Sequence, residues 1–259
     1  MKRITQLKDE ALDALHGNFG RAALATLGFF AVTNAISFLF SLTGGINILQ
    51  YYKAMLDGDF SSLFDATEGN VFLSIIQFLV GIFFTAPFGV GVINAFRALF
   101  ESKGEDKAIF TNFFKIGFSK NYLHIVLVSF VSGLLIGLMI VPALLVMILV
   151  IIIFHNIAAT IIFVIAAVVY TFWIGLMYSQ INYIIVNNPE LDIIDTMRRS
   201  RTLMDGNKWR FFLLGLSFLG WIILGIFTLC IGYLWLIPYI YTTESAFYCD
   251  IRDAEKIAE

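Results

Sequence analysis

Residues 122–186 decide the fold of this chain. They read YLHIVLVSFVSGLLIGLMIVPALLVMILVIIIF (Tyr122–Phe154), then His155 and Asn156, then IAATIIFVIAAVVYTFWIGLMYSQINYIIV. A helix rises about 1.5 Å per residue, so about 20 apolar residues cross a bilayer core of about 30 Å. The apolar residues follow one another without the alternation of a membrane strand. The block is therefore long enough for two or three membrane-spanning helices, depending on whether Pro142 also ends one.

Four further apolar stretches flank this block, and they occupy residues 22–42, 71–96, 211–229 and 233–248. Of the 259 residues, 59% are hydrophobic and only 14% are charged. A soluble domain usually carries about 25% charged residues. The chain is therefore predicted to be an all-α polytopic membrane protein with one membrane domain over residues 1–259.

The basic residues decide the number of spans. With six spans, all of the 17 Lys and Arg residues except Lys53 lie on one side of the membrane. The positive-inside rule makes that side cytoplasmic. Seven spans would instead place Arg198, Arg199 and Arg201 outside. We therefore expect six transmembrane helices, arranged as three two-span hairpins, with both termini in the cytoplasm. The net charge of −2 argues against a nucleic-acid binder.

The residue types that usually carry catalysis are scattered. His16 and His124 are expected on the inner side and His155 on the outer side, so they cannot share a metal ion. Cys230 and Cys249 are expected at opposite membrane surfaces, whereas a disulfide needs Cα atoms within about 7 Å, so both should be free thiols. No nucleophile motif, carboxylate pair or phosphate-binding loop occurs in the sequence. We expect no catalytic site, no metal and no cofactor, and hence no enzyme.

A short amphipathic helix is predicted on the cytoplasmic side before each hairpin, within residues 4–15, 107–115 and 189–206. In the third, Asn188 is expected to cap the helix and Pro189 to occupy its first position. Gly206 is expected to end it. The apolar stripe of this third helix consists of Ile193, Ile194, Met197 and Met204.

Short sequence matches recur along the chain. Asn18, Asn121 and Asn207 each follow one of the predicted short helices. Pro87 and Pro238 each lie seven residues before a polar-Ala-Phe triplet. These matches indicate three parallel repeats over residues 1–101, 105–188 and 189–252. The alternative is that short matches arise by chance in a compositionally biased sequence.

The later part of the chain carries the most specific sequence runs. They are NNPE at 187–190, MRRSRTLMDGNKW at 197–209, LSFLGW at 216–221, GYLWLIPY at 232–239 and AFY at 246–248. These runs resemble the bacterial integral-membrane family called domain of unknown function 975. Members often have a Pro-Gly break and an Ala-Phe-Tyr run around the fourth span, where this chain has Pro142-Ala143 and Ile181-Asn182-Tyr183. The resemblance implies six helices in the cytoplasmic (inner) membrane of a bacterium, and it implies no established activity.

Polar residues gather near the inner ends of the even-numbered spans. Such side chains are costly in hydrocarbon, so each needs a partner or a water-filled cavity. If the repeat is genuine, these ends converge on one cytoplasm-facing polar pocket, in which Arg97 can pair with Glu244. The alternative is that the residues lie at headgroup depth and contact water. The candidate pocket residues are Asn94, Arg97, Gln180, Asn182 and Glu244.

A second group of candidate residues follows the fourth span. Each basic side chain at the membrane surface contributes about 1 kcal/mol to the binding of anionic headgroups. The expected lipid contacts are Arg198, Arg199, Arg201, Lys208 and Arg210. We therefore expect a non-enzymatic membrane module that interacts with lipids or with partner proteins, either another membrane protein or a second copy. The alternative is a small-solute transporter or channel that uses the polar pocket.

Overall fold

The computed structural model describes residues 1–42, 53, 56–58, 71–105, 109–117, 121–154, 157–228 and 231–258. Within these residues every regular element is an α-helix. Three stretches are long and apolar enough to cross a membrane, namely Tyr122–Val150, Thr160–Asn187 and Lys208–Phe227. These observations confirm the prediction of an all-helical chain that contains candidate membrane-spanning helices, for the residues described. The predictions for Cys230 and His155 lie outside the described residues.

The long helices follow the predicted apolar stretches. They are α2 (Phe19–Leu42), α5 (Val71–Glu101), α7 (Tyr122–Phe154), α8 (Ile157–Met177) with α9 (Ile181–Asn187), α11 (Lys208–Leu216) with α12 (Leu219–Phe227), and α13 (Tyr233–Ala258). The apolar stretch that begins at residue 157 forms two helices, with a short turn at 178–180 between them. The stretch at 211–229 lies on two helices as well, with a turn at 217–218. Helices α5 and α13 continue past their apolar stretches into charged sequence.

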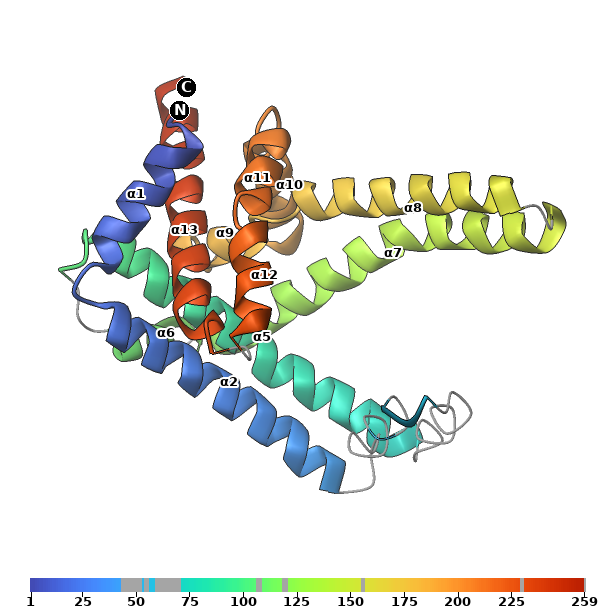
Figure 1. The fold of residues 1–259 in the computed structure, drawn as a ribbon, viewed down its shortest axis with the longest axis horizontal. Coiled ribbons are helices and arrows are strands. Elements are labelled where there is room, and N and C mark those ends of the chain that lie inside the picture. Colours follow the sequence, from blue (N-terminus) through green and yellow to red (C-terminus); the bar gives the residue numbers. More distant parts are fainter. Residues whose placement is uncertain are drawn as a thin grey trace.

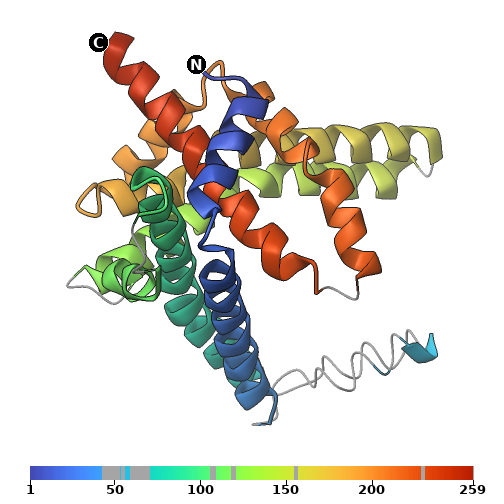
Figure 2. The same ribbon diagram turned by 60° about the vertical axis from the view of Figure 1, so that its left-hand side comes forward.

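The helices are arranged as pairs that diverge from one end of the molecule. Helices α7 and α8 form a long antiparallel hairpin that extends away from the other helices (Figure 1). Helices α2 and α5 lie side by side in both views (Figures 1 and 2). The N- and C-terminal ends lie close together, where α1 (Ile4–Leu15) packs against α13 (Figure 2).

The other two short helices are α6 (Ile109–Gly117) and α10 (Ile193–Leu203). Helix α6 packs closely on α5 at Gly91, because glycine has no side chain. The backbone of Phe113 occupies the space that a side chain at this position would need. A residue larger than glycine at position 91 would therefore push the two helices apart.

Helix α10 begins later than predicted. Asn188 does not cap it: its N–H donates to the carbonyl of Ile184 at 2.8 Å and so closes α9. Pro189 lies in the turn that follows, and Asp192 precedes the first residue of α10. The prediction failed because α9 continues through Asn187, which leaves Asn188 at the end of one helix and not at the start of the next.

The buried core lies where α1, α9, α10, α11 and α13 meet the inner parts of α5 and α7. Leu7, Ile184, Met204 and Phe247 are almost fully buried in one cluster there. A second cluster joins α1, α2, α5 and α6 around Phe88, Leu99, Ile109 and Phe113, with edge-to-face contact between Phe88 and Phe113. The core thus sits beside the short helices, away from the far ends of the long hairpins.

Candidate functional site where α5, α9 and α13 meet

The residues of the predicted pocket have separate partners. Arg97 on α5 donates from Nη1 to Asn187 Oδ1 at 2.7 Å, and its Nη2 lies 3.9 Å from Glu101 Oε2. Glu244 on α13 instead accepts a hydrogen bond from the Tyr183 hydroxyl at 3.1 Å. Among the described residues, the expected pairing of Arg97 with Glu244 is therefore not formed.

The three amides of the predicted pocket have local roles. Asn94 is buried and donates from Nδ2 to the carbonyl of Asn112 at 2.7 Å, which fastens α6 to α5. Gln180 is fully buried and donates to Ser179 Oγ at 3.0 Å, while the side chain of Asn182 is exposed. No hydrogen bond in the described part of the chain joins these amides to Arg97 or to Glu244.

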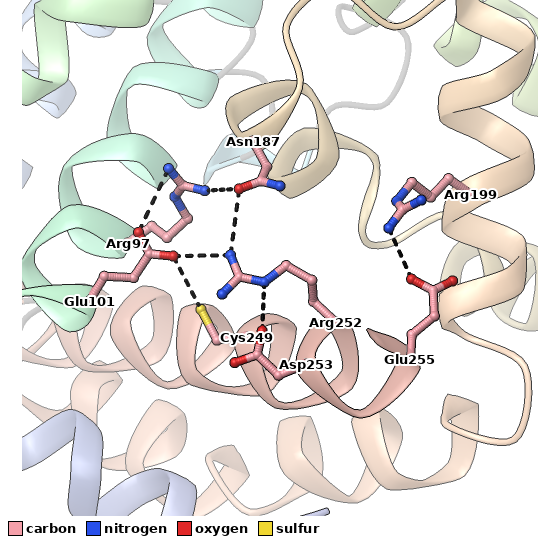
Figure 3. Close-up of polar contacts among 8 residues, drawn as sticks. All are labelled: Arg97, Glu101, Asn187, Arg199, Cys249, Arg252, Asp253 and Glu255. Carbon is pink, nitrogen blue, oxygen red and sulfur yellow. Dashed lines mark hydrogen bonds and ion pairs between the residues drawn. The ribbon is translucent and has the colours of Figure 1, made fainter. Parts of the chain in front are cut away.

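A different cluster forms around Arg252, in the charged half of α13 (Figure 3). Its Nη1 donates to Glu101 Oε1 at 3.1 Å and lies 3.5 Å from Asn187 Oδ1, and its Nε donates to Asp253 at 3.0 Å. Asn187 Oδ1 therefore accepts from two guanidinium groups, that of Arg97 and that of Arg252. These contacts tie together the ends of three helices that are far apart in the sequence.

Two further contacts extend the cluster (Figure 3). The Cys249 thiol lies 3.7 Å from Glu101 Oε1. Arg199 on α10 pairs with Glu255 at 2.9 Å, so α10 is also attached to α13. The cluster contains three cations and three carboxylates, and this balance lowers the cost of placing so many charges together.

The electrostatics of the cluster keep Arg252 charged. Burial by itself lowers the pKa of the Arg252 guanidinium, but hydrogen bonds with Asp253 and Glu101 outweigh it, and the pKa rises above its ordinary value. Charge-assisted hydrogen bonds of this kind are stronger than neutral ones. The arrangement is thus suited to holding helices in register. In the part of the chain that the structure describes, no group of His, Cys, Asp and Glu is placed to hold a metal ion.

Some polar atoms of the cluster and its surroundings are buried without a partner in the described structure. They include Nε of Arg97 and the hydroxyl of Tyr248. The ring of Tyr248 is stacked on Tyr183 with centroids 5.4 Å apart, and the Arg252 guanidinium lies 5.8 Å from the Tyr248 ring centre. Polar atoms in this position are usually paired by ordered water.

The five predicted lipid contacts divide into two sets. Arg199 pairs with Glu255, Arg210 bonds to Asp250 and to the carbonyl of Lys2, and Lys208 lies 5.0 Å from the centre of the Trp173 ring. Arg198 and Arg201 remain exposed, and the side chain of Arg198 is 73% exposed while it pairs with Asp195 at 3.2 Å. Two of the five basic residues therefore face outward.

Sequence reasoning missed Glu101, Asn187 and Arg252. A weak signal was present for Glu101, because Arg97 and Glu101 are four residues apart and share a helix face. Asn187 opens the NNPE run that carries part of the family resemblance. Nothing in the sequence connects Arg252 with either residue, since the contact depends on how α13 packs.

The comparisons with known proteins place the whole chain in one family. A family model described as "Protein of unknown function (DUF975)" matches residues 1–255, which include every residue of the Arg252 cluster. Neither the curated proteins nor the solved structures gave a match. The match confirms the resemblance that was carried by the runs after Asn187. The chain therefore belongs to the DUF975 family.

Proposed function

We propose that this protein is a non-enzymatic membrane module that crosses the bacterial cytoplasmic membrane six times. In this proposal both termini are cytoplasmic, and the outward face of α10 binds anionic lipid headgroups. The six spans would be α2, α5, α7, α8 with α9, α11 with α12, and the apolar half of α13. The contact between Lys2 and Asp250 supports an even number of spans, since an even number returns the chain to its starting side.

The proposed repeat is supported by a recurring helix start. The carbonyls of Asn18, Asn121 and Asn207 accept hydrogen bonds from the N–H four residues later, at 2.9, 2.9 and 3.0 Å. In each case a short helix precedes the asparagine and an apolar helix follows it, a long one after Asn18 and Asn121 and the nine-residue α11 after Asn207. We therefore retain three repeats, over 1–101, 105–188 and 189–252, as part of the proposal.

The observation that carries the lipid-binding proposal is the two-sided character of α10. Its inner face is buried through Met197, Ser200 and Leu203, and Ser200 donates to the carbonyl of Met177 at 3.1 Å. Its outer face presents Arg198 and Arg201.

Apolar and aromatic side chains lie close to these arginines in the sequence. Ile194 of α10 is 59% exposed, and Trp209, which is 67% exposed, opens the apolar stretch Lys208–Phe227. Basic, aliphatic and indole groups at the start of a span are typical of the headgroup layer. This combination favours lipid headgroups over bulk water as the neighbours of α10.

The test compares the protein in two kinds of lipid nanodisc. One contains phosphatidylcholine alone, and in the other part of it is replaced by anionic phosphatidylglycerol. We expect the wild-type protein to unfold at a higher temperature in the anionic discs, and the difference to shrink as salt is added. The double variant Arg198→Gln, Arg201→Gln should lose most of this difference.

The matched control is Arg198→Lys, Arg201→Lys, which retains both charges and should behave like the wild type. If the Gln variant keeps the full effect of anionic lipid, the assignment to α10 is wrong. Partner proteins remain a separate expectation, which chemical crosslinking in native membranes checks by revealing either a second copy or another membrane protein.

A further inference from the structure

A hollow of about 610 Å³ opens between α1, the end of α5 and the charged half of α13. Small-molecule sites commonly have volumes of about 300–1,000 Å³. The wall includes Phe100 and Ala14, which offer apolar surface, and the lining also carries side chains of both charges. The hollow shares Glu101 and Arg252 with the cluster at the ends of α5, α9 and α13, so its wall is firmly braced.

Most charges that line the hollow are already paired. Lys2 pairs with Glu10 at 2.7 Å, and Arg252 pairs with Glu101 and with Asp253. Two charged residues of the lining are different. In the described structure, the side chains of Asp13 and Lys103 form neither an ion pair nor a hydrogen bond, with each other or with another residue. The hollow therefore offers one free carboxylate and one free ammonium.

The backbone holds Lys103 in an unusual conformation. Its φ is 52°, in the left-handed region that a residue with a side chain rarely adopts, and Gly104 follows with φ 82°. The turn is fastened to the segment between α1 and α2: Asn18 Nδ2 donates to the Gly104 carbonyl at 2.8 Å. A Cβ on Gly104 would come within 2.6 Å of the Ala14 carbonyl oxygen. The Lys103 N–H donates to the carbonyl of Phe100, and the Gly104 N–H donates to that of Leu99. The turn is therefore a C-terminal cap of α5 that fixes the backbone of Lys103 beside the hollow.

We propose that this hollow binds a small zwitterionic group that carries a primary ammonium and an oxyanion a few bonds apart. The ammonium donates to the Asp13 carboxylate, the oxyanion accepts from Lys103, and the intervening methylenes lie against Phe100. Phosphoethanolamine has this chemistry, either as a soluble molecule or as the headgroup of phosphatidylethanolamine. The site involves neither Arg198 nor Arg201, so it does not depend on the proposed role of α10.

The experiment measures thermal stabilisation of the purified full-length protein in phosphatidylcholine nanodiscs. The probe is soluble phosphoethanolamine, compared with phosphocholine, ethanolamine and inorganic phosphate. We expect saturable stabilisation by phosphoethanolamine. Phosphocholine should bind at least about tenfold more weakly, because its quaternary ammonium has no N–H to donate. Ethanolamine and phosphate, which each carry one of the two charges, should also bind more weakly.

Two variants and a matched control assign the effect to the hollow. Asp13→Asn and Lys103→Gln should each weaken the apparent affinity for phosphoethanolamine about tenfold. Asp9→Asn changes an exposed carboxylate of the same helix that does not line the hollow, and it should leave the affinity unchanged. Because Asp13 and Lys103 have no partner in the described structure, neither change is expected to unfold the protein.

Nanodiscs that contain phosphatidylethanolamine distinguish the two sources. If the lipid headgroup occupies the hollow, the wild-type protein is already stabilised in these discs and soluble phosphoethanolamine adds little. If the occupant is a soluble zwitterion, both kinds of disc give the same unfolding temperature and the soluble probe stabilises in both. The proposal is overturned if no zwitterion binds in any disc, if phosphate alone binds equally well, or if Asp13→Asn behaves like Asp9→Asn.

Discussion

The α7–α8 hairpin and helix α13 show two ways in which one chain uses its helices. The hairpin is apolar and faces outward beyond the first turns of α7: only 6% of the most apolar window within Tyr122–Val150 is buried. Helix α13 begins apolar and ends charged, and its middle is enclosed by protein, with Phe247 and Tyr248 fully buried. The most hydrophobic helices are thus the least buried in protein. In this chain, hydropathy indicates which surface suits lipid, while the tertiary core depends on a helix of mixed composition.

The largest expected contrast is in core packing. Phe247→Ala should lower the free energy of unfolding by about 3–5 kcal/mol, because it leaves a cavity beside Phe211, whose ring centre lies 5.1 Å away. Leu138→Ala on α7, where the side chain is 65% exposed, should change it by less than about 0.5 kcal/mol. Denaturant unfolding in detergent micelles, followed by tryptophan fluorescence, measures both. Equal losses for the two variants would contradict the comparison.

The second contrast concerns the charged half of α13. Arg252→Gln removes the donor to Glu101 and Asp253. We expect a loss of about 1–2 kcal/mol, because the Arg252 side chain is only 15% exposed, whereas water can partly replace it at Glu101 and Asp253, which are 38% and 58% exposed. Lys256→Gln, one turn further along the same helix and exposed, is the control and should have almost no effect. The same unfolding measurement applies. A loss in the control as large as that in Arg252→Gln would show that the network does not stabilise the fold.

Two glycines, one confined by protein and one in open space, should respond to substitution by alanine with stability changes of opposite sign. Gly104→Ala should destabilise by about 1–2 kcal/mol, because the residue has φ 82° and abuts the carbonyl of Ala14. Gly137→Ala on α7 meets no atom within 4 Å and should stabilise the helix by about 0.5–1 kcal/mol. Thermal unfolding of both variants in the same micelles tests the opposite signs. If Gly137→Ala also destabilises the protein, α7 is packed against protein in the micelle; if Gly104→Ala stabilises it, the turn after α5 is not confined by Ala14.

The smallest expected effect is that of Glu244→Gln, in the apolar half of α13. The amide oxygen can still accept from Tyr183, so stability should change by no more than about 0.5 kcal/mol. Uptake of small solutes into proteoliposomes should equal that of empty vesicles for both forms. Wild-type uptake that Glu244→Gln abolishes would instead favour the transporter alternative.

Much of the helical framework could be predicted from hydropathy, and the reason is physical. A run such as residues 122–154 is long enough to cross a bilayer and has no charged residue to interrupt it. The turns at 178–180 and 217–218 could not be predicted, because neither contains proline or glycine. The start of α10 was misplaced because Asn188 has the chemistry both to end a helix and to begin one.

The site was harder to predict than the fold. Arg97 was a candidate pocket residue expected to pair with Glu244, but its partners are Asn187 and Glu101. Choosing between these acceptors requires the rotation of α5 relative to α9 and α13, and local sequence carries no such information. The exposed arginines of α10 were recognised as a group, yet sequence alone did not separate Arg198 from the internally paired Arg199.

The contact between α1 and α13 has a consequence for how the protein is made. The backbone N–H of Lys2 donates to Asp250, 248 residues further along the chain, and the buried face of α1 includes Leu7 and Leu15. The ribosome releases α1 before α13, and although Leu15 can pack early against α2, α5 and α6, the face with Leu7 lacks its α13 partner until the chain has been synthesised past Asp250. We expect a chaperone or the membrane surface to shield Leu7 during that interval.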